Sequence, residues 1–251
     1  MTRLAAFQSA LSFLTRLPVG ADSSGWEAFR STPATFPLVG FVVGGLVSLP
    51  LLASGTLPGP TVALGYLLAV YLVTGIHHLD GVADLGDAAV VHGDRSRRRQ
   101  VLKDTTTGVG ALAAVTVVIV GLALGALELV TLPVAVAVGI VVAAEVGGKL
   151  GLAAMACFGT VSHEGMGSQL TAAVDASAFW PPAAVAVPAL VMTWPHPAAV
   201  AAVGGALCGC ALPWWWANRQ LGGISGDVFG AAAELGRLGG LHAGVIAWTL
   251  W

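Results

Sequence analysis

Residues Gly75–Ala88 read GIHHLDGVADLGDA, and they continue an apolar stretch, residues 61–76, that reads TVALGYLLAVYLVTGI. Three aspartates, Asp80, Asp84 and Asp87, therefore stand at the mouth of a hydrophobic segment. Ionisable side chains are rare in or beside membrane-spanning segments, and where they occur they pair with a partner or serve a function. The stretch predicts a membrane boundary that carries a functional site.

The composition of the whole chain predicts an all-α, polytopic integral membrane protein. Of its 251 residues, 56% are hydrophobic and only 10% are charged, and the mean hydropathy is +0.84. A soluble domain carries about 25% charged residues, so this chain cannot supply a polar surface of that kind. Short alternating segments typical of a transmembrane β-barrel are absent. No linker or repeat divides the chain, which predicts one domain over residues 1–251.

A helix that crosses the bilayer core needs about 20 apolar residues. Several candidates are separated by turns rich in proline and glycine. They predict about six to seven transmembrane helices, within residues 36–56, 60–78, 108–128, 131–152, 178–194, 197–217 and 229–250.

Charged residues are distributed unequally between the two sides of this map. Lys and Arg occur before the first span and in the loops after the second and sixth spans, and Lys149 and Arg237 lie within spans near the same side, while the opposite turns have none. The positive-inside rule then places the N-terminus and residues 79–107, 153–177 and 218–228 in the cytoplasm. Of thirteen Asp and Glu, only Glu128 falls at an external turn. We therefore expect the active-site loops on the cytoplasmic face of the cell (inner) membrane, unlike a transporter with polar groups near the midplane.

The three aspartates recur at positions i, i+4 and i+7, which share one face of a helix. Like charges at this spacing destabilise a helix, so a cation is expected to compensate them. Mg²⁺ binds carboxylate oxygens and often keeps waters and substrate phosphates as further ligands. We therefore expect Asp80, Asp84 and Asp87 to be catalytic and to bind metal. The alternative is a solvated acidic helix end.

The next segment, residues 95–110, reads RSRRRQVLKDTTTGVG. Its arginines are typical of topology charges that face anionic lipid. Asp104 is expected to be a further metal ligand. The start of a helix with hydroxyls and glycines can bind phosphate, although GVG alone is also ordinary helix packing. On this basis the expected substrate-binding residues are Lys103, Thr105, Gly108 and Gly110.

Two further polar segments belong to the same side, residues 162–169 (SHEGMGSQ) and 218–237 (NRQLGGISGDVFGAAAELGR). Their acidic residues Glu164 and Asp227 lie beside glycines and are expected in catalysis. Asp227 equally suits the N-cap of the last helix. His77 precedes Asp80 by three residues on roughly the same stripe, so it is expected to bind substrate, whereas His78 is expected to point elsewhere.

Acidic groups, a basic cluster and glycines on one membrane face indicate transfer of a phosphoryl or nucleotidyl-type group, with Mg²⁺ neutralising a diphosphate. Walker A, G-x-S-x-G and H-E-x-x-H motifs are absent. P-loop ATP hydrolysis and serine or zinc hydrolysis are therefore unsupported. No nucleic-acid partner is expected.

At these residues the sequence resembles the cobalamin synthase family. The similar segments cover nearly the whole chain: FLTRLPV (13–19), TFPLVG (35–40), HLDGVADLGDA (78–88), LKDTTTGVGAL (102–112), HEGMG (163–167) and GGISGDVFGAAAELG (222–236). The resemblance implies a membrane enzyme that joins adenosylcobinamide-GDP to α-ribazole or its 5′-phosphate and releases GMP, with Mg²⁺ required. Its partners would be these corrinoid and α-ribazole substrates and the lipid bilayer. A homo-oligomer or a complex with other corrinoid-pathway enzymes stays open.

The resemblance adds Arg16, together with Lys103, as residues that would hold phosphate oxygens. Two positions depart from the family pattern. Relatives commonly have Ser-Arg after the Lys-Asp pair, where this chain has Thr105 and Thr106. Lys149 stands where relatives tend to have arginine, and lysine lacks the bidentate fork.

Three other classes of protein are alternatives to this family. A CDP-alcohol phosphotransferase, the main alternative, also uses an aspartate-rich helix with Mg²⁺, but Asp84 stands where its motif has arginine, and the later spacing differs. A UbiA-type prenyltransferase would need a second aspartate-rich motif. A permease or scaffold of a corrinoid-pathway complex is the non-enzymatic alternative, and charges gathered at one face argue against a permease.

Overall fold

The computed structural model describes residues 3–20, 22–104 and 106–251, and this part of the chain is helical with no β-strand. The predicted all-α fold is therefore confirmed. The elements in chain order are α1 (Arg3–Leu14), α2 (Ser23–Arg30), α3 (Thr35–Val47), the 3-10 helix η1 (Leu49–Ala53), α4 (Gly59–Thr74), α5 (His77–Val90), α6 (Arg95–Val101), α7 (Val109–Thr131), α8 (Val134–Phe158), α9 (Met166–Thr171), η2 (Ala176–Phe179), α10 (Trp180–Leu190), α11 (Ala198–Gln220) and α12 (Gly226–Leu250).

Four helical stretches of the described chain are long and apolar enough to cross a membrane, so the protein is polytopic. Helices α4 and α5 add a fifth if the bent pair is one broken span. The sequence predicted six to seven transmembrane helices, and the described residues support four or five of them. Helix α10 has 11 residues, too few for a bilayer core. Helix α12 has 25 residues but carries Asp227, Glu234 and Arg237. The four stretches are Thr35–Ala53, Val109–Thr131, Val134–Phe158 and Ala198–Gln220.

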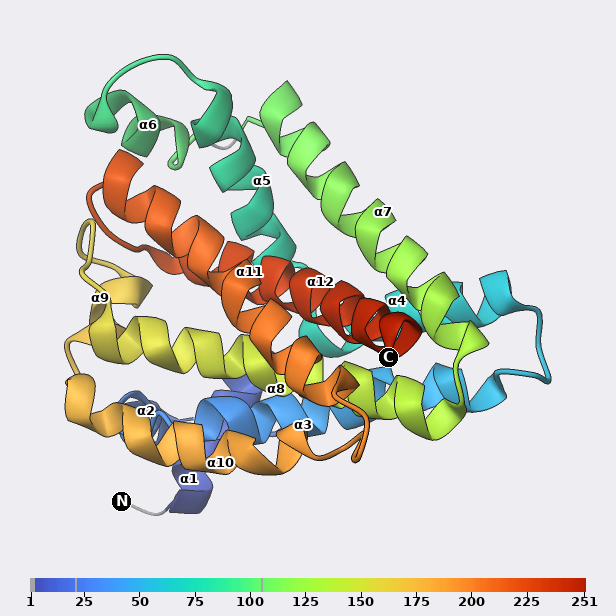
Figure 1. Cartoon of the computed structure of the whole chain (residues 1–251). Coiled ribbons are helices and arrows are strands. Elements are labelled where there is room, and N and C mark those ends of the chain that lie inside the picture. The colour runs from blue at the N-terminus through green and yellow to red at the C-terminus, as the bar shows by residue number, and fades with distance from the viewer. Residues whose placement is uncertain (1–2, 21, 105) are drawn as a thin grey trace.

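A sharp bend separates α4 from α5, where the sequence predicted one span over residues 60–78. Helix α4 ends at Thr74, and the two helices meet at 95°. Gly75 has a φ of 72°, which glycine adopts without steric cost. Beside it the Arg16 backbone N–H donates to the Val73 carbonyl at 2.7 Å. The aspartates therefore lie on a separate helix, which Figure 1 shows running from the centre of the molecule towards α6.

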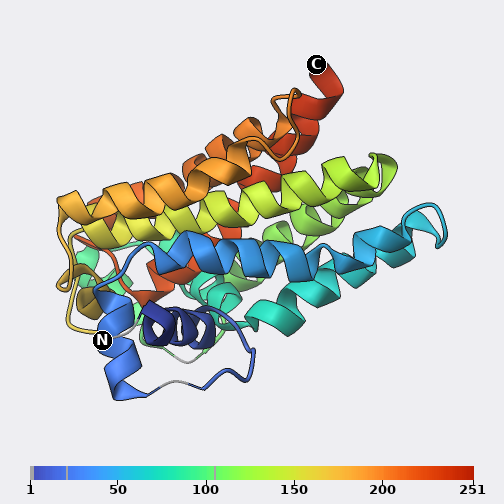
Figure 2. The same ribbon diagram turned by 90° about the horizontal axis from the view of Figure 1, so that it is seen from below.

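The charged loops gather at one end of the helix bundle. Figures 1 and 2 show α2, α6, α9 and the N-terminal region at this end. The short turns at residues 54–58, 132–133 and 191–197 lie towards the opposite end. The predicted segregation of the charged loops is therefore confirmed as a feature of the fold.

Helix α8 forms the centre of the bundle and packs against α3, α11 and α12. Small residues allow these helices to approach closely, as expected for packing in lipid. A Cβ added at Gly240 of α12 would lie 2.7 Å from the Cβ of Ala144 in α8, and one at Gly205 of α11 would lie 2.5 Å from the Gly239 carbonyl oxygen. Larger residues at these positions would force α12 away from its neighbours.

Four charged side chains are buried together between α8 and α12, and each is at most 2% exposed. Glu145 pairs with the Nε of Arg237 and, at 3.2 Å, with the Nζ of Lys149. A guanidinium nitrogen of Arg237 also lies 2.6 Å from Glu234. We call Glu145, Lys149, Glu234 and Arg237 the buried ionic cluster. It joins the two helices by charges that have little access to water.

We predict that Arg237→Met destabilises the protein strongly. Removing one member of a buried ion pair leaves an uncompensated charge and costs about 3–5 kcal/mol. The thermal unfolding midpoint in detergent should fall well below that of the wild type. Arg97→Met, which removes an exposed arginine of α6, is the control and should leave the midpoint unchanged. Equal midpoints for both variants would show that the ionic cluster does not stabilise the fold.

Candidate active site

The aspartates of α5 line a hollow of about 310 Å³ next to the loop that leads into α7. Its lining includes Asp80, Asp84, Asp87, Lys103 and Asp104, and we call it the acidic hollow. Asp80 is exposed, while Asp84 and Asp87 are half-buried. The predicted convergence of the three aspartates on one helix face is therefore confirmed.

Asp87 also has a structural role that its spacing did not reveal. Its two carboxylate oxygens accept hydrogen bonds from the backbone N–H groups of Gly108, at 2.7 Å, and Ala111, at 2.9 Å. A carboxylate at a helix N-terminus accepts hydrogen bonds from free N–H groups. Its negative charge also interacts favourably with the helix dipole. Asp87 thus fastens the start of α7 to α5. The N–H group of Gly108, which was expected to help bind phosphate, therefore already has this carboxylate as its partner.

Asp104 is held within the loop that closes the hollow. Its Oδ1 accepts hydrogen bonds from the Thr106 backbone N–H at 3.0 Å and from the Thr106 hydroxyl at 2.8 Å. These bonds stabilise the carboxylate form, so they lower the pKa of Asp104. Asp104 therefore presents a negative charge to the acidic hollow next to the ammonium-bearing side chain of Lys103.

A fifth aspartate approaches this region from α12. Asp227 lies in the first turn of α12. The sequence also suited Asp227 as the N-cap of this helix, but the N-cap is Ser225. The Ser225 hydroxyl donates to Asp227 Oδ2 at 3.2 Å. Gly81 lets α5 approach closely, since an added Cβ would lie 2.5 Å from the Asp227 carbonyl oxygen. Asp84 is consequently repelled electrostatically by Asp227 as well as by Asp80 and Asp87.

The chemistry of these residues fits a shared magnesium ion better than a closed metal centre. Among the described residues, no three His, Cys, Asp or Glu side chains are arranged as a ready-made metal cage. Mg²⁺ is often held by one or two carboxylates, with waters and substrate phosphates completing its octahedron. Asp80 and Asp84 repel each other beside an open hollow. These two side chains fit an ion that a diphosphate substrate helps to bind.

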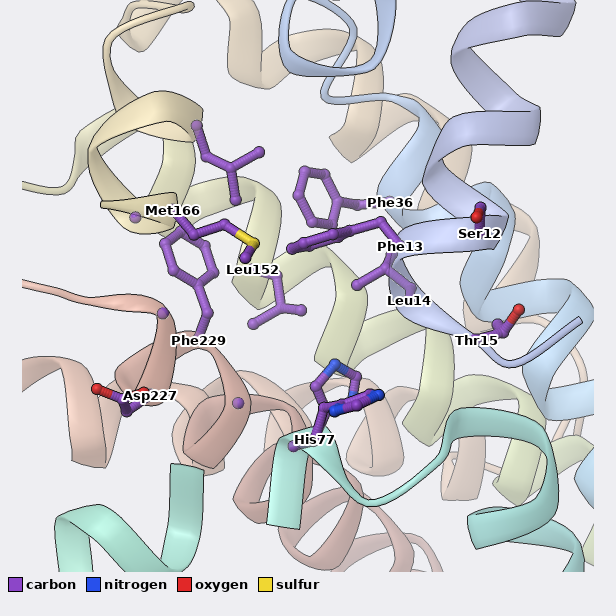
Figure 3. Close-up of a pocket in the computed structure, with 15 residues that line it drawn as sticks. Ser12, Phe13, Leu14, Thr15, Phe36, His77, Leu152, Met166, Asp227 and Phe229 are labelled. Atoms are coloured by element: carbon purple, nitrogen blue, oxygen red, sulfur yellow. The ribbon is translucent and has the colours of Figure 1, made fainter. Parts of the chain in front are cut away.

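A second cavity, of about 420 Å³, adjoins the beginning of α5. Its apolar lining includes Phe13, Phe36, Leu152, Met166 and Phe229, and we call it the aromatic cavity (Figure 3). Its polar lining residues are Ser12, Thr15, His77, His78 and Asp227. Asp227 therefore belongs to the cavity wall and also interacts electrostatically with Asp80 of the acidic hollow.

Comparison with known proteins identifies the family. The family model described as cobalamin-5-phosphate synthase matches residues 6–245. The chain belongs to this family. A relative from Halorubrum lacusprofundi is 52% identical over 98% of this chain and 98% of its own length, and one from Haloquadratum walsbyi is 42% identical over 98% and 99%. Both are named adenosylcobinamide-GDP ribazoletransferase. No solved structure gives a significant match to this chain.

Membership of the cobalamin-5-phosphate synthase family confirms the resemblance seen in the sequence and argues against the CDP-alcohol phosphotransferase alternative. The structure brings most of the predicted site residues of this family member to two adjoining places. Asp80, Asp84, Asp87, Lys103 and Asp104 share the acidic hollow. His77 and Asp227 line the aromatic cavity.

Other predicted residues lie differently. Glu164 is exposed in the loop before α9 and lines neither the acidic hollow nor the aromatic cavity. Arg16 lies at the bend, where a Cβ on Gly75 would meet its Cδ at 2.9 Å. Gly110 is buried against α5, with an added Cβ 2.5 Å from the Gly86 carbonyl oxygen, so its evident role is packing. Thr105 lies outside the described residues.

Sequence reasoning missed the aromatic cavity, because its residues come from helices far apart in the chain. His78 was expected to point elsewhere, yet it lines this cavity. Phe13 and Phe229 gave no local signal, since phenylalanine is ordinary in a hydrophobic helix. One partial signal for these two residues was present in the sequence. Phe13 lies in FLTRLPV and Phe229 lies in SGDVFG, and both segments resemble the cobalamin synthase family.

We predict that Asp87→Ala loosens the start of α7. Loss of a helix-capping carboxylate costs about 0.5–2 kcal/mol, so backbone amides in residues 106–114 should exchange with solvent deuterium faster. Hydrogen–deuterium exchange read by mass spectrometry measures this effect.

Asp94→Ala is the matched control, because Asp94 caps α6 through the Arg97 N–H at 2.9 Å. It should accelerate exchange in residues 95–101 and leave residues 106–114 unchanged. Unaltered exchange in residues 106–114 of Asp87→Ala would contradict the capping role.

Proposed function

We propose that this chain joins adenosylcobinamide-GDP to α-ribazole, or to its 5′-phosphate, and releases GMP. Its membership of the cobalamin-5-phosphate synthase family supports this function, as do relatives at 52% and 42% identity named for the activity. The structural observation that carries the proposal is the acidic hollow with Lys103 at its edge. Carboxylates for a divalent cation beside a cationic side chain suit a diphosphate donor.

In the proposed reaction, a ribose hydroxyl oxygen of α-ribazole forms a bond to the phosphorus attached to cobinamide. The bond between that phosphorus and the bridging oxygen of GMP breaks, and GMP leaves with the bridging oxygen. The hydroxyl proton passes to a carboxylate of the enzyme. Asp227 is our candidate for this base, because it lines the aromatic cavity and its backbone packs closely against Gly81 of α5.

The residues of the acidic hollow would hold and orient the donor. Mg²⁺, when bound, would neutralise the diphosphate and the departing GMP. Asp80 and Asp84 are its main proposed ligands, with Asp104 contributing from the loop. Lys103 would contact phosphate oxygens, and Arg16 would add a positive charge near the bend. Asp87 would act chiefly by fixing α7, since both of its oxygens accept backbone hydrogen bonds.

We also propose that the charged end of the bundle faces the cytoplasm of the cell membrane. The excess of Lys and Arg in the loops of that end supports this orientation. In a Cys208→Ser background, a cysteine at Ser96 should react with an impermeant maleimide only after lysis of the cells. A cysteine at Thr56 should react in intact cells. The reverse pattern would place the acidic hollow outside.

We predict that Asp80→Asn greatly slows GMP release while the protein remains folded in the membrane. Loss of one preorganised electrostatic contact to a reacting group lowers kcat roughly 10²- to 10³-fold. GMP release should be measured with purified protein, adenosylcobinamide-GDP, α-ribazole and Mg²⁺. A chelator should stop the wild-type reaction, and added Mg²⁺ should restore it.

Asp175→Asn is the control for this experiment. Asp175 is an exposed carboxylate that caps η2 through Ser177, and its replacement should leave the rate of GMP release unchanged. Wild-type turnover in Asp80→Asn would overturn the role of the acidic hollow. Absence of GMP release from the wild type under these conditions would overturn the proposed reaction.

A further inference from the structure

We propose that the aromatic cavity binds the heteroaromatic base of α-ribazole and so holds the acceptor substrate. This assignment rests on the proposed function, because it names the place of one of the two substrates. It divides the site into a cavity for the acceptor and the acidic hollow for the diphosphate of the donor.

The cavity has the size and lining of a site for a flat aromatic ligand. Its volume of about 420 Å³ lies within the range of about 300–1,000 Å³ that small-molecule pockets occupy. In Figure 3 the rings of Phe13 and Phe36 lie on one side, and Met166 with Phe229 lies on the other. Aromatic rings and methionine sulfur both contact the faces and edges of aromatic ligands favourably. A heteroaromatic base can therefore pack between these two sides.

The wall formed by Phe13 and Phe36 is supported by a third aromatic ring. Phe29 lies behind both rings, with ring centroids 5.5 Å from Phe13 and 5.2 Å from Phe36. Phe29 itself is fully buried. A wall held in place in this way loses little conformational entropy when the ligand binds. The aromatic cluster of α1, α2 and α3 thus has a function beyond packing.

Polar groups in the lining of the cavity suit the ribose of the same ligand. Nδ1 of His78 is buried and has no hydrogen-bond partner among the described residues. A buried polar atom without a partner is unfavourable, and a ribose hydroxyl would supply one. His77 and Asp227 also line this cavity and are labelled in Figure 3. The cavity therefore offers apolar contacts for a base and polar contacts for a sugar.

The position of Asp227 connects the acceptor with the donor. Asp227 lines the aromatic cavity and interacts electrostatically with Asp80 and Asp84 of the acidic hollow. His77 and Asp80 are three residues apart on α5, about 4.5 Å along the helix axis. A ribose hydroxyl held at Asp227 would therefore face the phosphorus of a donor bound in the acidic hollow.

The other hollows suit the acceptor less well. The acidic hollow has no aromatic side chain in its lining. A groove of about 570 Å³ between α5, α7, α11 and α12 includes Trp215 and Trp216, but none of its lining residues is charged. A nucleoside needs both an apolar surface and hydrogen-bonding groups. Only the aromatic cavity combines them among these three.

The test measures binding of α-ribazole alone by isothermal titration calorimetry with the purified full-length protein. Phe229→Leu keeps an apolar side chain and removes one ring, so the Kd for α-ribazole should rise about tenfold or more, as for loss of one stacking partner of a base. Met166→Ala, at a residue that is 51% exposed, should also weaken binding. The Kd for adenosylcobinamide-GDP should stay unchanged in both variants.

Phe158→Leu is the matched control, since Phe158 packs against Phe179 outside the cavity at 5.2 Å. It should bind α-ribazole like the wild type. An unchanged Kd for α-ribazole in both cavity variants, or a weakened Kd for the donor instead, would overturn the assignment. Phe229-dependent binding by a protein that releases no GMP would uphold the cavity and refute the proposed reaction.

Discussion

The pairing of buried charges between α8 and α12 is the constraint on which the rest of the structure depends. Glu145, Lys149, Glu234 and Arg237 lie where water cannot compensate them, so each must keep its partner. A shift of α12 along α8 by one turn would separate Arg237 from Glu145. The small residues of α12 then allow close packing only in this register. The buried ionic cluster thereby determines where the first turn of α12, with Asp227, meets α5.

Helix α5 is the second element that organises the site. The bend at Gly75 frees it from α4, so its aspartates line the acidic hollow while its first residues, His77 and His78, line the aromatic cavity. Asp87 fixes α7 to the other end of α5. One short helix thus lines both the acidic hollow and the aromatic cavity, the places that we propose for the donor diphosphate and the acceptor. The bend at Gly75 and the hydrogen bonds of Asp87 to α7 fix the two ends of α5, so the two cavities keep the same position relative to each other.

Local sequence patterns predicted those features that depend on neighbours along the chain. The spacing of Asp80, Asp84 and Asp87 predicted their common face, and apolar runs predicted the helices and their charged end. Features that depend on packing between distant segments were not predictable: the pairing of Glu145 with Arg237, the capping of α7 by Asp87, and the meeting of Phe13 with Phe229. The sequence did not predict the bend at Gly75, because an apolar run continues across it. The positive φ of Gly75 is a backbone property that hydropathy does not report.

The central claim is that the carboxylates of α5 hold the diphosphate of a nucleotide-activated donor through a cation. An experimental structure of the protein with adenosylcobinamide-GDP and Mg²⁺ tests it most directly. We expect the diphosphate and a metal ion in the acidic hollow, with Asp80 or Asp84 coordinating the ion and Lys103 near the phosphates. A diphosphate bound at the opposite end of the bundle, or in the groove between α7 and α11 without contact to these aspartates, would contradict the account.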